Sequence, residues 1–222
     1  PDAWRIWPIH AVSGVTAGGR IFTSARNARP EVSSEVKDNG GTVKVSGALV
    51  AVKIINDPDA PDKARAKELM YDDTLEGKVG YTRTFKIDGK GVGVETTVIG
   101  DGKDSIAELY ETIPVYLGYA PTQVTNANVK IELQVGGKWA PATDQYVEKV
   151  KAIRVTRFSG AVLVTFEKPC RMKLSPGEWV DNWLNVGATC RNVMIDLMDN
   201  GGKPDVLKKT LTIAYRIETA MK

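Results

Sequence analysis

Residues 129–137 read Val-Lys-Ile-Glu-Leu-Gln-Val-Gly-Gly, an apolar–polar alternation that stops at a glycine pair. A period of two places one row of side chains on a core and the other in water, as a half-buried antiparallel strand requires. The same alternation returns at 92–98, directly after an Asp-Gly pair, and again at 211–217. Extended strands are therefore the expected secondary structure of this chain.

Further apolar segments are predicted as strands at 20–24, 32–37, 42–55, 81–87, 153–158 and 162–166. Asn-Gly, Asp-Gly and Gly-Gly pairs lie between them, and these residues supply the positive φ that tight hairpin turns need. Short strands separated by turns at regular spacing are typical of a sandwich or barrel. The sequence predicts an all-β chain folded as a large two-sheet antiparallel β-sandwich, supersandwich-like in size.

One segment departs from this pattern. Residues 62–71 are rich in helix formers and follow Pro58 and Pro61. They form either a short surface helix or the tip of a long inserted hairpin, so we expect at most one or two short helices. No internal repeat and no linker interrupts the 222 residues, a length that single β-sandwiches reach. We therefore predict one domain, 1–222.

The charge and hydropathy of the chain argue against two classes of partner. Basic and acidic residues number 30 and 27 and alternate along the chain. The densest basic group, formed by Lys149, Lys151, Arg154 and Arg157, is predicted to be a solvated strand face, so we expect no nucleic acid. No apolar run approaches the ~20 residues of a membrane span. The chain opens without Met or a leader, which indicates a processed protein or a piece of a larger one.

Two cysteines, Cys170 and Cys190, lie in segments predicted to be neighbouring strands. A disulfide closing this ~20-residue loop would contribute about 3 kcal/mol and would indicate an oxidising compartment. Two buried free thiols are the alternative, because free cysteine is among the most buried residue types. The bridge, if formed, favours a secreted or periplasmic protein.

Catalytic signals in the sequence are few. His10 is the single histidine, so a multi-histidine zinc site is excluded and any histidine-based dyad or triad must use this residue. The aspartates cluster at turns without the ligand spacing of a calcium loop. We assign no catalytic residue, no metal ligand and no cofactor from the sequence.

The segment 108–112 holds the best local pair of acids. Alternation places Glu108 and Tyr110 on one face of a strand and Glu111 on the other. Paired carboxylates can cleave glycosidic bonds when they meet in space. The alternative is a strand edge with solvated acids.

Five tryptophans stand beside only four phenylalanines. Flat aromatic rings stack on the apolar faces of sugars, so exposed tryptophans on a β-sandwich favour carbohydrate binding; the competing interpretation is core packing, since tryptophan is mostly buried. The candidate carbohydrate-binding residues are Trp7, His10, Tyr110, Trp139, Trp179 and Trp183.

Several stretches resemble a known family. They are Trp7-Pro8-Ile9-His10, the segment 18–25, Tyr81-Thr82-Arg83-Thr84-Phe85, the strand 91–95 and the segment 110–115. They resemble the β-supersandwich, akin to galactose mutarotase, of heparinase II/III-like polysaccharide lyases, over roughly the first half of the chain. In that family an α/α-toroid supplies most catalytic residues. This sequence lacks such a toroid, so the resemblance implies an accessory sandwich without lyase activity of its own.

Three functions follow as hypotheses. The first is a non-catalytic domain of a polysaccharide-processing protein that packs on a catalytic domain of its parent chain or contacts glycan. The second is a small β-jelly-roll lyase or glycosidase using Tyr110, His10 and an acid or arginine in a cleft. The third is a structural or assembly module without ligand, which a large apolar patch would favour.

Overall fold

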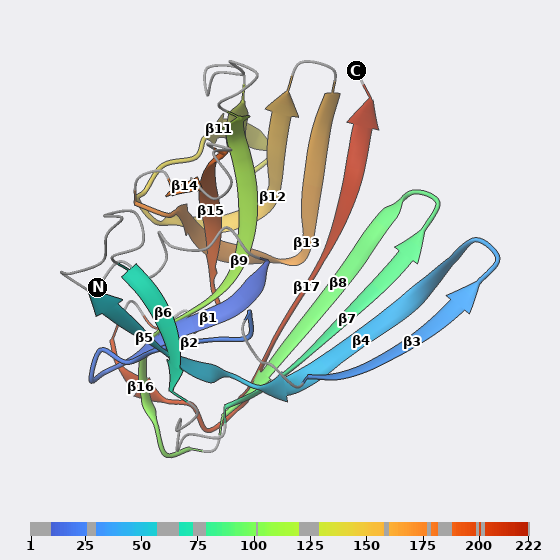
Figure 1. The fold of residues 1–222 in the computed structure, drawn as a ribbon. Helices are drawn as coiled ribbons and strands as arrows, with labels where there is room; N and C mark the ends of the chain where they lie inside the picture. The colour runs from blue at the N-terminus through green and yellow to red at the C-terminus, as the bar shows by residue number, and fades with distance from the viewer. Residues whose placement is uncertain are drawn as a thin grey trace.

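A computed structural model describes residues 10–25, 30–56, 67–72, 79–100, 102–119, 129–157, 160–176, 179–181, 188–198, 200 and 203–221. The described residues form seventeen strands and no helix, and every strand pair is antiparallel. The predicted all-β, two-layered antiparallel architecture is confirmed (Figure 1). No helix long and apolar enough to cross a membrane occurs in this part of the chain.

Nine strands form the layer that we call the large sheet. In order across the sheet they are β3 (Glu31–Lys37), β4 (Gly40–Ala48), β7 (Gly80–Asp88), β8 (Gly91–Ile99), β17 (Thr210–Met221), β13 (Gly160–Leu174), β12 (Val147–Arg157), β10 (Lys130–Val135) and β11 (Lys138–Pro141).

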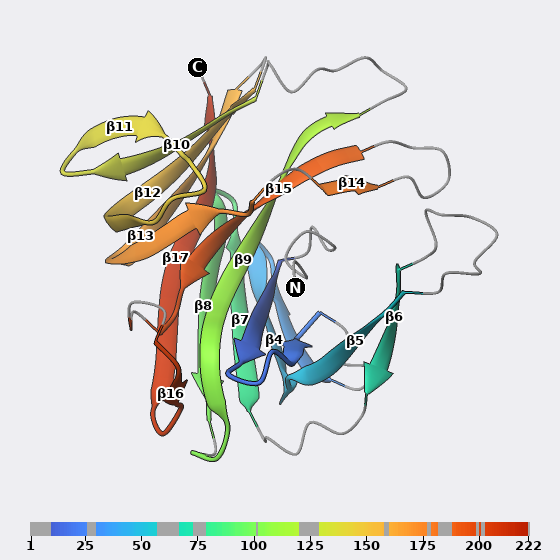
Figure 2. The same cartoon turned by 90° about the vertical axis from the view of Figure 1, so that its left-hand side faces the viewer.

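The remaining strands form the small sheet, which faces the large one. In order they are β6 (Lys67–Asp72), β5 (Val50–Asn56), β2 (Ile21–Thr23), β1 (Ala11–Thr16), β9 (Ser105–Tyr119) and β15 (Ala188–Asp196), with β14 (Trp179–Asp181) beside β15 and β16 (Asp205–Val206) beside β9. Figure 2 shows β9 and β1 in front of the strands of the large sheet.

Strand β13 joins the two layers. Its first half, 160–166, pairs with β17 of the large sheet, and its second half, 171–174, pairs with β15 of the small sheet. Beside this change of partner, β12 carries a bulge between Val147 and Val150, where Lys149 has a φ of 55°. A bulge bends its strand and increases the local twist, which suits the point where one layer turns into the other.

The core fills the space between the layers. One apolar cluster packs β12, β13 and β17 against β9 and β15, with Phe166 and Ile195 among its fully buried members. A second cluster packs β1 and β2 against β7, β8 and β9 around Phe22 and Leu109. Where these two apolar clusters meet, along β9 and β7, lies a cluster of polar side chains that includes Glu111 and Arg83.

One predicted strand needs correction, and the structure decides between the two alternatives given for residues 62–71 over the part that it describes. The strand predicted over 42–55 is broken at Leu49, which is 1% exposed and donates its backbone N–H to Val79 O. The break lets β4 pair in the large sheet and β5 in the small one. Residues 67–71 belong to β6 and are not helical, because six residue pairs tie them into a hairpin with β5; residues 62–66 lie outside the described part of the chain.

Of the two alternatives for Cys170 and Cys190, the structure shows the free thiols and not the disulfide. Their segments are neighbouring strands as predicted, but the register pairs Arg171 with Asp196. Continuing this register places Cys170 opposite position 197, one residue past the end of β15 and seven residues from Cys190, or about 23 Å. A disulfide needs Cα atoms within about 7 Å. The two cysteines therefore give no support for an oxidising compartment.

Candidate functional site

A buried carboxylate stands at the centre of the sandwich. Glu111 lies on β9 between Val12 of β1 and Ile195 of β15, and its side chain is fully buried. Of the two interpretations of the segment 108–112, the strand edge with solvated acids is wrong for Glu111, because β9 is an interior strand of the small sheet. An ionised carboxylate away from water needs charged and hydrogen-bonding partners.

The large sheet supplies most of these partners from three neighbouring strands. Glu111 Oε1 accepts hydrogen bonds from Arg83 Nη2 of β7 at 2.6 Å, from the Tyr215 hydroxyl of β17 at 2.7 Å and from Thr96 Oγ1 of β8 at 3.2 Å. Arg83 and Thr96 face each other directly in the β7–β8 register, and Arg83 Nε donates to Thr96 Oγ1 at 3.3 Å. Charged and hydroxyl side chains from one sheet thus meet a carboxylate from the other.

His10 completes the cluster at its surface end. Its ring Nε2 lies 3.2 Å from Glu111 Oε1 and is hydrogen-bonded to the Tyr215 hydroxyl, and its carbonyl accepts a 2.7 Å bond from Arg83 Nη1. The ring stands edge-on to Phe85, with 6.1 Å between centroids. Because its side chain is 25% exposed while Glu111 is buried, His10 is the member through which the cluster meets solvent.

The partners of Nε2 favour one tautomer of the imidazole. Tyr215 has one hydroxyl proton, and it donates that proton to Glu111. The bond between Tyr215 and His10 must then run from Nε2–H to the phenol oxygen, so His10 carries a proton on Nε2. In the neutral ring Nδ1 is consequently a lone-pair acceptor, and no residue in the described part of the chain engages it.

The environment lowers the pKa of Glu111 and raises the pKa of Tyr215. Burial raises the pKa of Glu111, but Arg83, His10 and Tyr215 together lower it below its ordinary value, so the group is a carboxylate at neutral pH. Burial and the charge of Glu111 raise the pKa of Tyr215 well above its ordinary value, so it stays a phenol and a donor. Such divergent titrating pairs are concentrated at functional sites, although structural networks produce them too.

One atom of the cluster is left without a partner. Glu111 Oε2 is buried and accepts no hydrogen bond from a described residue, while Oε1 accepts from Arg83, Thr96 and Tyr215 and lies 3.2 Å from His10 Nε2. An unmet buried acceptor costs about 1–3 kcal/mol.

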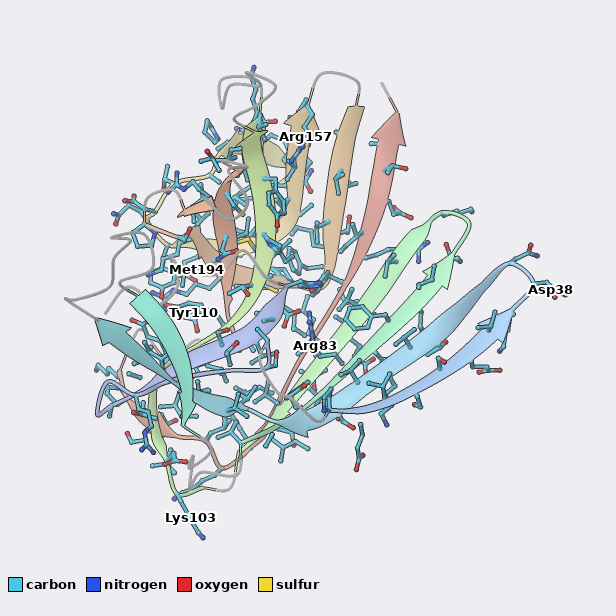
Figure 3. All side chains as sticks on the ribbon, viewed as in Figure 1. Asp38, Arg83, Lys103, Tyr110, Arg157 and Met194 are labelled. Atoms are coloured by element: carbon cyan, nitrogen blue, oxygen red, sulfur yellow. The ribbon has the colours of Figure 1, made fainter. Side chains whose placement is uncertain are left out.

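The cluster opens onto an apolar face of the large sheet. Directly paired residues on adjacent strands point to the same side, and here they continue from Phe85 to Val43 on β4 and to Val94 on β8. Phe85 and Val43 are only half-buried, and the hairpins β3–β4 and β7–β8 reach beyond the small sheet (Figure 1). Figure 3 shows Arg83 between the layers and Asp38 at the far tip of β3–β4.

Tyr110 does not join His10, because it projects from the opposite face of β9 to its neighbour Glu111. It is buried, and its hydroxyl is hydrogen-bonded to that of Tyr146. Lys173 Nζ lies 4.4 Å from the centre of the Tyr146 ring, and the Arg171 guanidinium stacks at 3.8 Å on the same ring. Tyr110 thus belongs to a cation–π stack on the other side of the small sheet.

Among the four tryptophan candidates, Trp139 is the one whose side chain is described, and it does not join His10. Trp139 is paired with Gln134 on β10, on the outer side of the large sheet, and its ring carries the Arg154 guanidinium at 4.4 Å. Trp179 lies in β14, and its side chain is outside the described part. Trp7 and Trp183 fall outside the described residues altogether.

Three members of the cluster went unnoticed in the sequence: Arg83, Thr96 and Tyr215. The alternation of inward and outward positions along the predicted strands contained a signal for two of them. Arg83 and Thr96 occupy inward positions between apolar residues, where period two predicts another apolar side chain. A charged residue at an inward position of a confident strand needs a buried partner of opposite charge.

Comparison with known proteins gives distant likenesses only. No family model and no curated protein matches the sequence. Among solved structures, a protein from Escherichia coli K12 provisionally assigned as an aldose 1-epimerase is similar at a TM-score of 0.44 and 8% identity, covering 95% of this chain and 79% of that one. A galactose mutarotase-like protein from Clostridium acetobutylicum is similar at 0.42 and 9%, covering 89% and 68%.

At these scores the likenesses assign neither a family nor an activity to this chain. The link to heparinase II/III-like lyases therefore stays a prediction. Within the described residues, no three His, Cys, Asp or Glu side chains gather as a metal site requires.

Proposed function

We propose that this chain is a carbohydrate-contacting β-sandwich domain of a polysaccharide-processing protein, and that it meets the sugar at the His10 end of the Glu111 cluster. The observation that carries the proposal is the fixed imidazole, whose Nε2–H is held inward by Tyr215 and Glu111. Nδ1 then offers an oriented acceptor for a sugar hydroxyl, and the half-buried Phe85 supplies an aromatic surface beside it.

The buried part of the cluster holds the His10 side chain in one conformation before a ligand binds. A ligand that binds a side chain already held in one rotamer does not have to immobilise it, which saves about 0.5–1.5 kcal/mol per side chain. His10 is held at its ring by Tyr215 and at its carbonyl by Arg83. A few oriented polar groups beside an apolar surface are typical of small-ligand sites.

Calorimetric titration with neutral and acidic oligosaccharides tests this proposal. His10→Ala is expected to weaken binding at least tenfold, whereas Trp139→Ala, on the outer side of the large sheet, leaves it unchanged. The opposite pattern would place glycan contact at Trp139 and overturn the assignment of the site. Absence of heat with every sugar would overturn the carbohydrate part of the proposal.

A second function is favoured by the pairing of His10 with Glu111, which the enzymatic hypothesis required. A histidine oriented by a buried carboxylate, with its other nitrogen unengaged by described residues, is the arrangement of a general base. This candidate, a small lyase or glycosidase, differs from the sequence hypothesis in using Tyr215 in place of Tyr110. It predicts new reducing ends from a polysaccharide and their loss in His10→Ala; binding without turnover would exclude it.

Packing against a catalytic domain of a parent chain and a secreted or periplasmic location remain part of the proposal for the first function. Their support is the resemblance of the first half of the sequence to lyase sandwiches. Expression of the natural reading frame, followed by limited proteolysis, would show whether this domain is released alone or stays bound to a neighbour.

A further inference from the structure

Strand β3 is the end strand of the large sheet, and all seven of its residues are exposed. Its pairing with β4 runs from Glu31–Ser46 to Lys37–Gly40 without a bulge, and it contains no proline. Natural proteins protect such edges with short strands, charged side chains, bulges, prolines or inward-pointing charges. Of these devices β3 carries only charged side chains, Glu31, Glu35 and Lys37, all on its outer face. Among the described residues no strand pairs with its second edge, which is regular and long enough to accept another strand.

The side chains on the inner face of β3 are apolar or small. Val32 is 63% exposed and Val36 87% exposed, and Ser34 lies between them. Val32 pairs with Val45 of β4, and Val36 with Gly41, which in turn pairs with Ile87 of β7 at 46% exposure. The apolar face of the large sheet therefore continues to its last strand and ends there uncovered.

The sequence of β3 is complementary to itself when read backwards. Antiparallel pairing of two copies about Ser34 places Glu31 opposite Lys37, Val32 opposite Val36, and Ser33 opposite Glu35. Opposite charges meet at both ends, and the valines meet on the inner face. Cross-strand pairs of these two kinds each stabilise a sheet by about 0.2–1 kcal/mol.

We propose that two copies of this chain associate through β3, in an antiparallel pairing about a two-fold axis at Ser34. Such an interface is isologous, because each copy contributes the same strand. It joins the two large sheets into one and places Val36 beside Val32 of the partner subunit. The edge is then paired, and the apolar face is continuous across both copies.

The present contacts of the charged residues do not oppose this pairing. Lys37 Nζ lies 3.2 Å from Glu35 Oε1, with both side chains about two-thirds exposed. An exposed ion pair of this kind contributes little. Exchanging it for the Glu31 of the partner subunit costs correspondingly little.

Cysteine cross-linking tests the register of the dimer. In a Cys170→Ser background, Ser34→Cys places two cysteines directly opposite each other, with Cα atoms about 4.5–5.5 Å apart, a distance that a disulfide spans. Val32→Cys is the control, because its partner-subunit equivalent lies four residues away along the strand. We expect an oxidised dimer with Ser34→Cys only. Equal cross-linking of both variants, or none, would overturn the proposal.

Charge exchange tests the same interface without a covalent bond. Glu31→Lys and Lys37→Glu each bring like charges together twice per dimer, and each is expected to weaken dimerisation roughly tenfold in sedimentation velocity. The double variant restores opposite charges and should recover the dimer. A monomeric wild type at high concentration, or a double variant no better than the single ones, would contradict the proposal. Neither outcome bears on His10, so this test is independent of the carbohydrate proposal.

Discussion

Arg83 Nη2 donates a 2.6 Å hydrogen bond to Glu111 Oε1 across the two layers of the sandwich, and both side chains are at most 7% exposed. Each residue lies on an interior strand, so neither charge can reach water by a change of rotamer alone. The bond therefore ties the large sheet to the small one at the point where His10 enters the fold.

Removing one member of this pair should destabilise the protein more than removing both charges. Arg83→Met leaves the Glu111 carboxylate buried without its cation, and we expect a loss of about 3–5 kcal/mol in the free energy of unfolding. The double variant Arg83→Met, Glu111→Gln carries no buried charge and should recover much of that loss. Urea denaturation of the four proteins of this cycle measures the coupling; additive losses would show that the two residues do not interact.

The lowered pKa of Glu111 predicts how stability depends on pH. A carboxyl group whose pKa is lower in the folded state stabilises the fold above its unfolded pKa of about 4.3, and this contribution is lost as pH falls through the folded value. The stability of the wild type should therefore fall with acidification below about pH 5. Glu111→Gln should be less stable at neutral pH and show a flatter acid limb in pH-dependent denaturation. Parallel curves for the two proteins would contradict the assignment.

Strand β1, which carries His10 into the site, depends on one glycine. A Cβ on Gly14 would lie 2.3 Å from a ring carbon of Phe22 and 2.7 Å from Glu108 O. Gly14→Ala should therefore cost about 1–3 kcal/mol through overpacking. Gly18→Ala is the matched control, because the nearest atom to its Cβ is 3.8 Å away. Thermal unfolding should separate the two variants, and equal midpoints would show that β1 can shift without cost.

The two thiols should react differently. Burial raises the pKa of Cys190 to about 12, which keeps it protonated and unreactive in the fold, whereas Cys170 is only partly buried. A thiol reagent should modify one cysteine in the native protein and two after unfolding without reductant. If no thiol reacts even after unfolding, the cysteines are bridged and the register of β13 and β15 is different.

Local periodicity was sufficient to predict most of the strands. The alternation at 129–135 appears as β10, and the glycine pair behind it adopts φ values of 57° and 80°, as a tight hairpin requires. The break at Leu49 could not be predicted, because the chain from the end of β4 into β5 (Ala48-Leu49-Val50) is continuously apolar and only the partners of the two strands in different sheets separate them. The long strand β13 changes sheets for the same non-local reason.

The site was predictable only in part. His10 stood out as the lone histidine and the segment 108–112 as the best pair of acids, and the structure brings His10 and Glu111 together. Tyr110 and Glu111 were correctly assigned to opposite faces of one strand, but Tyr110 was grouped with His10, and it is Glu111 whose face carries the His10 cluster. Arg83 and Tyr215 come from strands far away in sequence, and no local pattern predicts which inward polar residues meet.

Histidine-selective NMR tests the central claim most directly, because the chain contains one histidine and its ring signals report on the proposed contact alone. We predict that a glycan fragment shifts the His10 ring resonances in a saturable way. The dissociation constant from this titration should equal the one from calorimetry. Ring signals that stay unmoved while a sugar binds, or with every sugar tested, would contradict it.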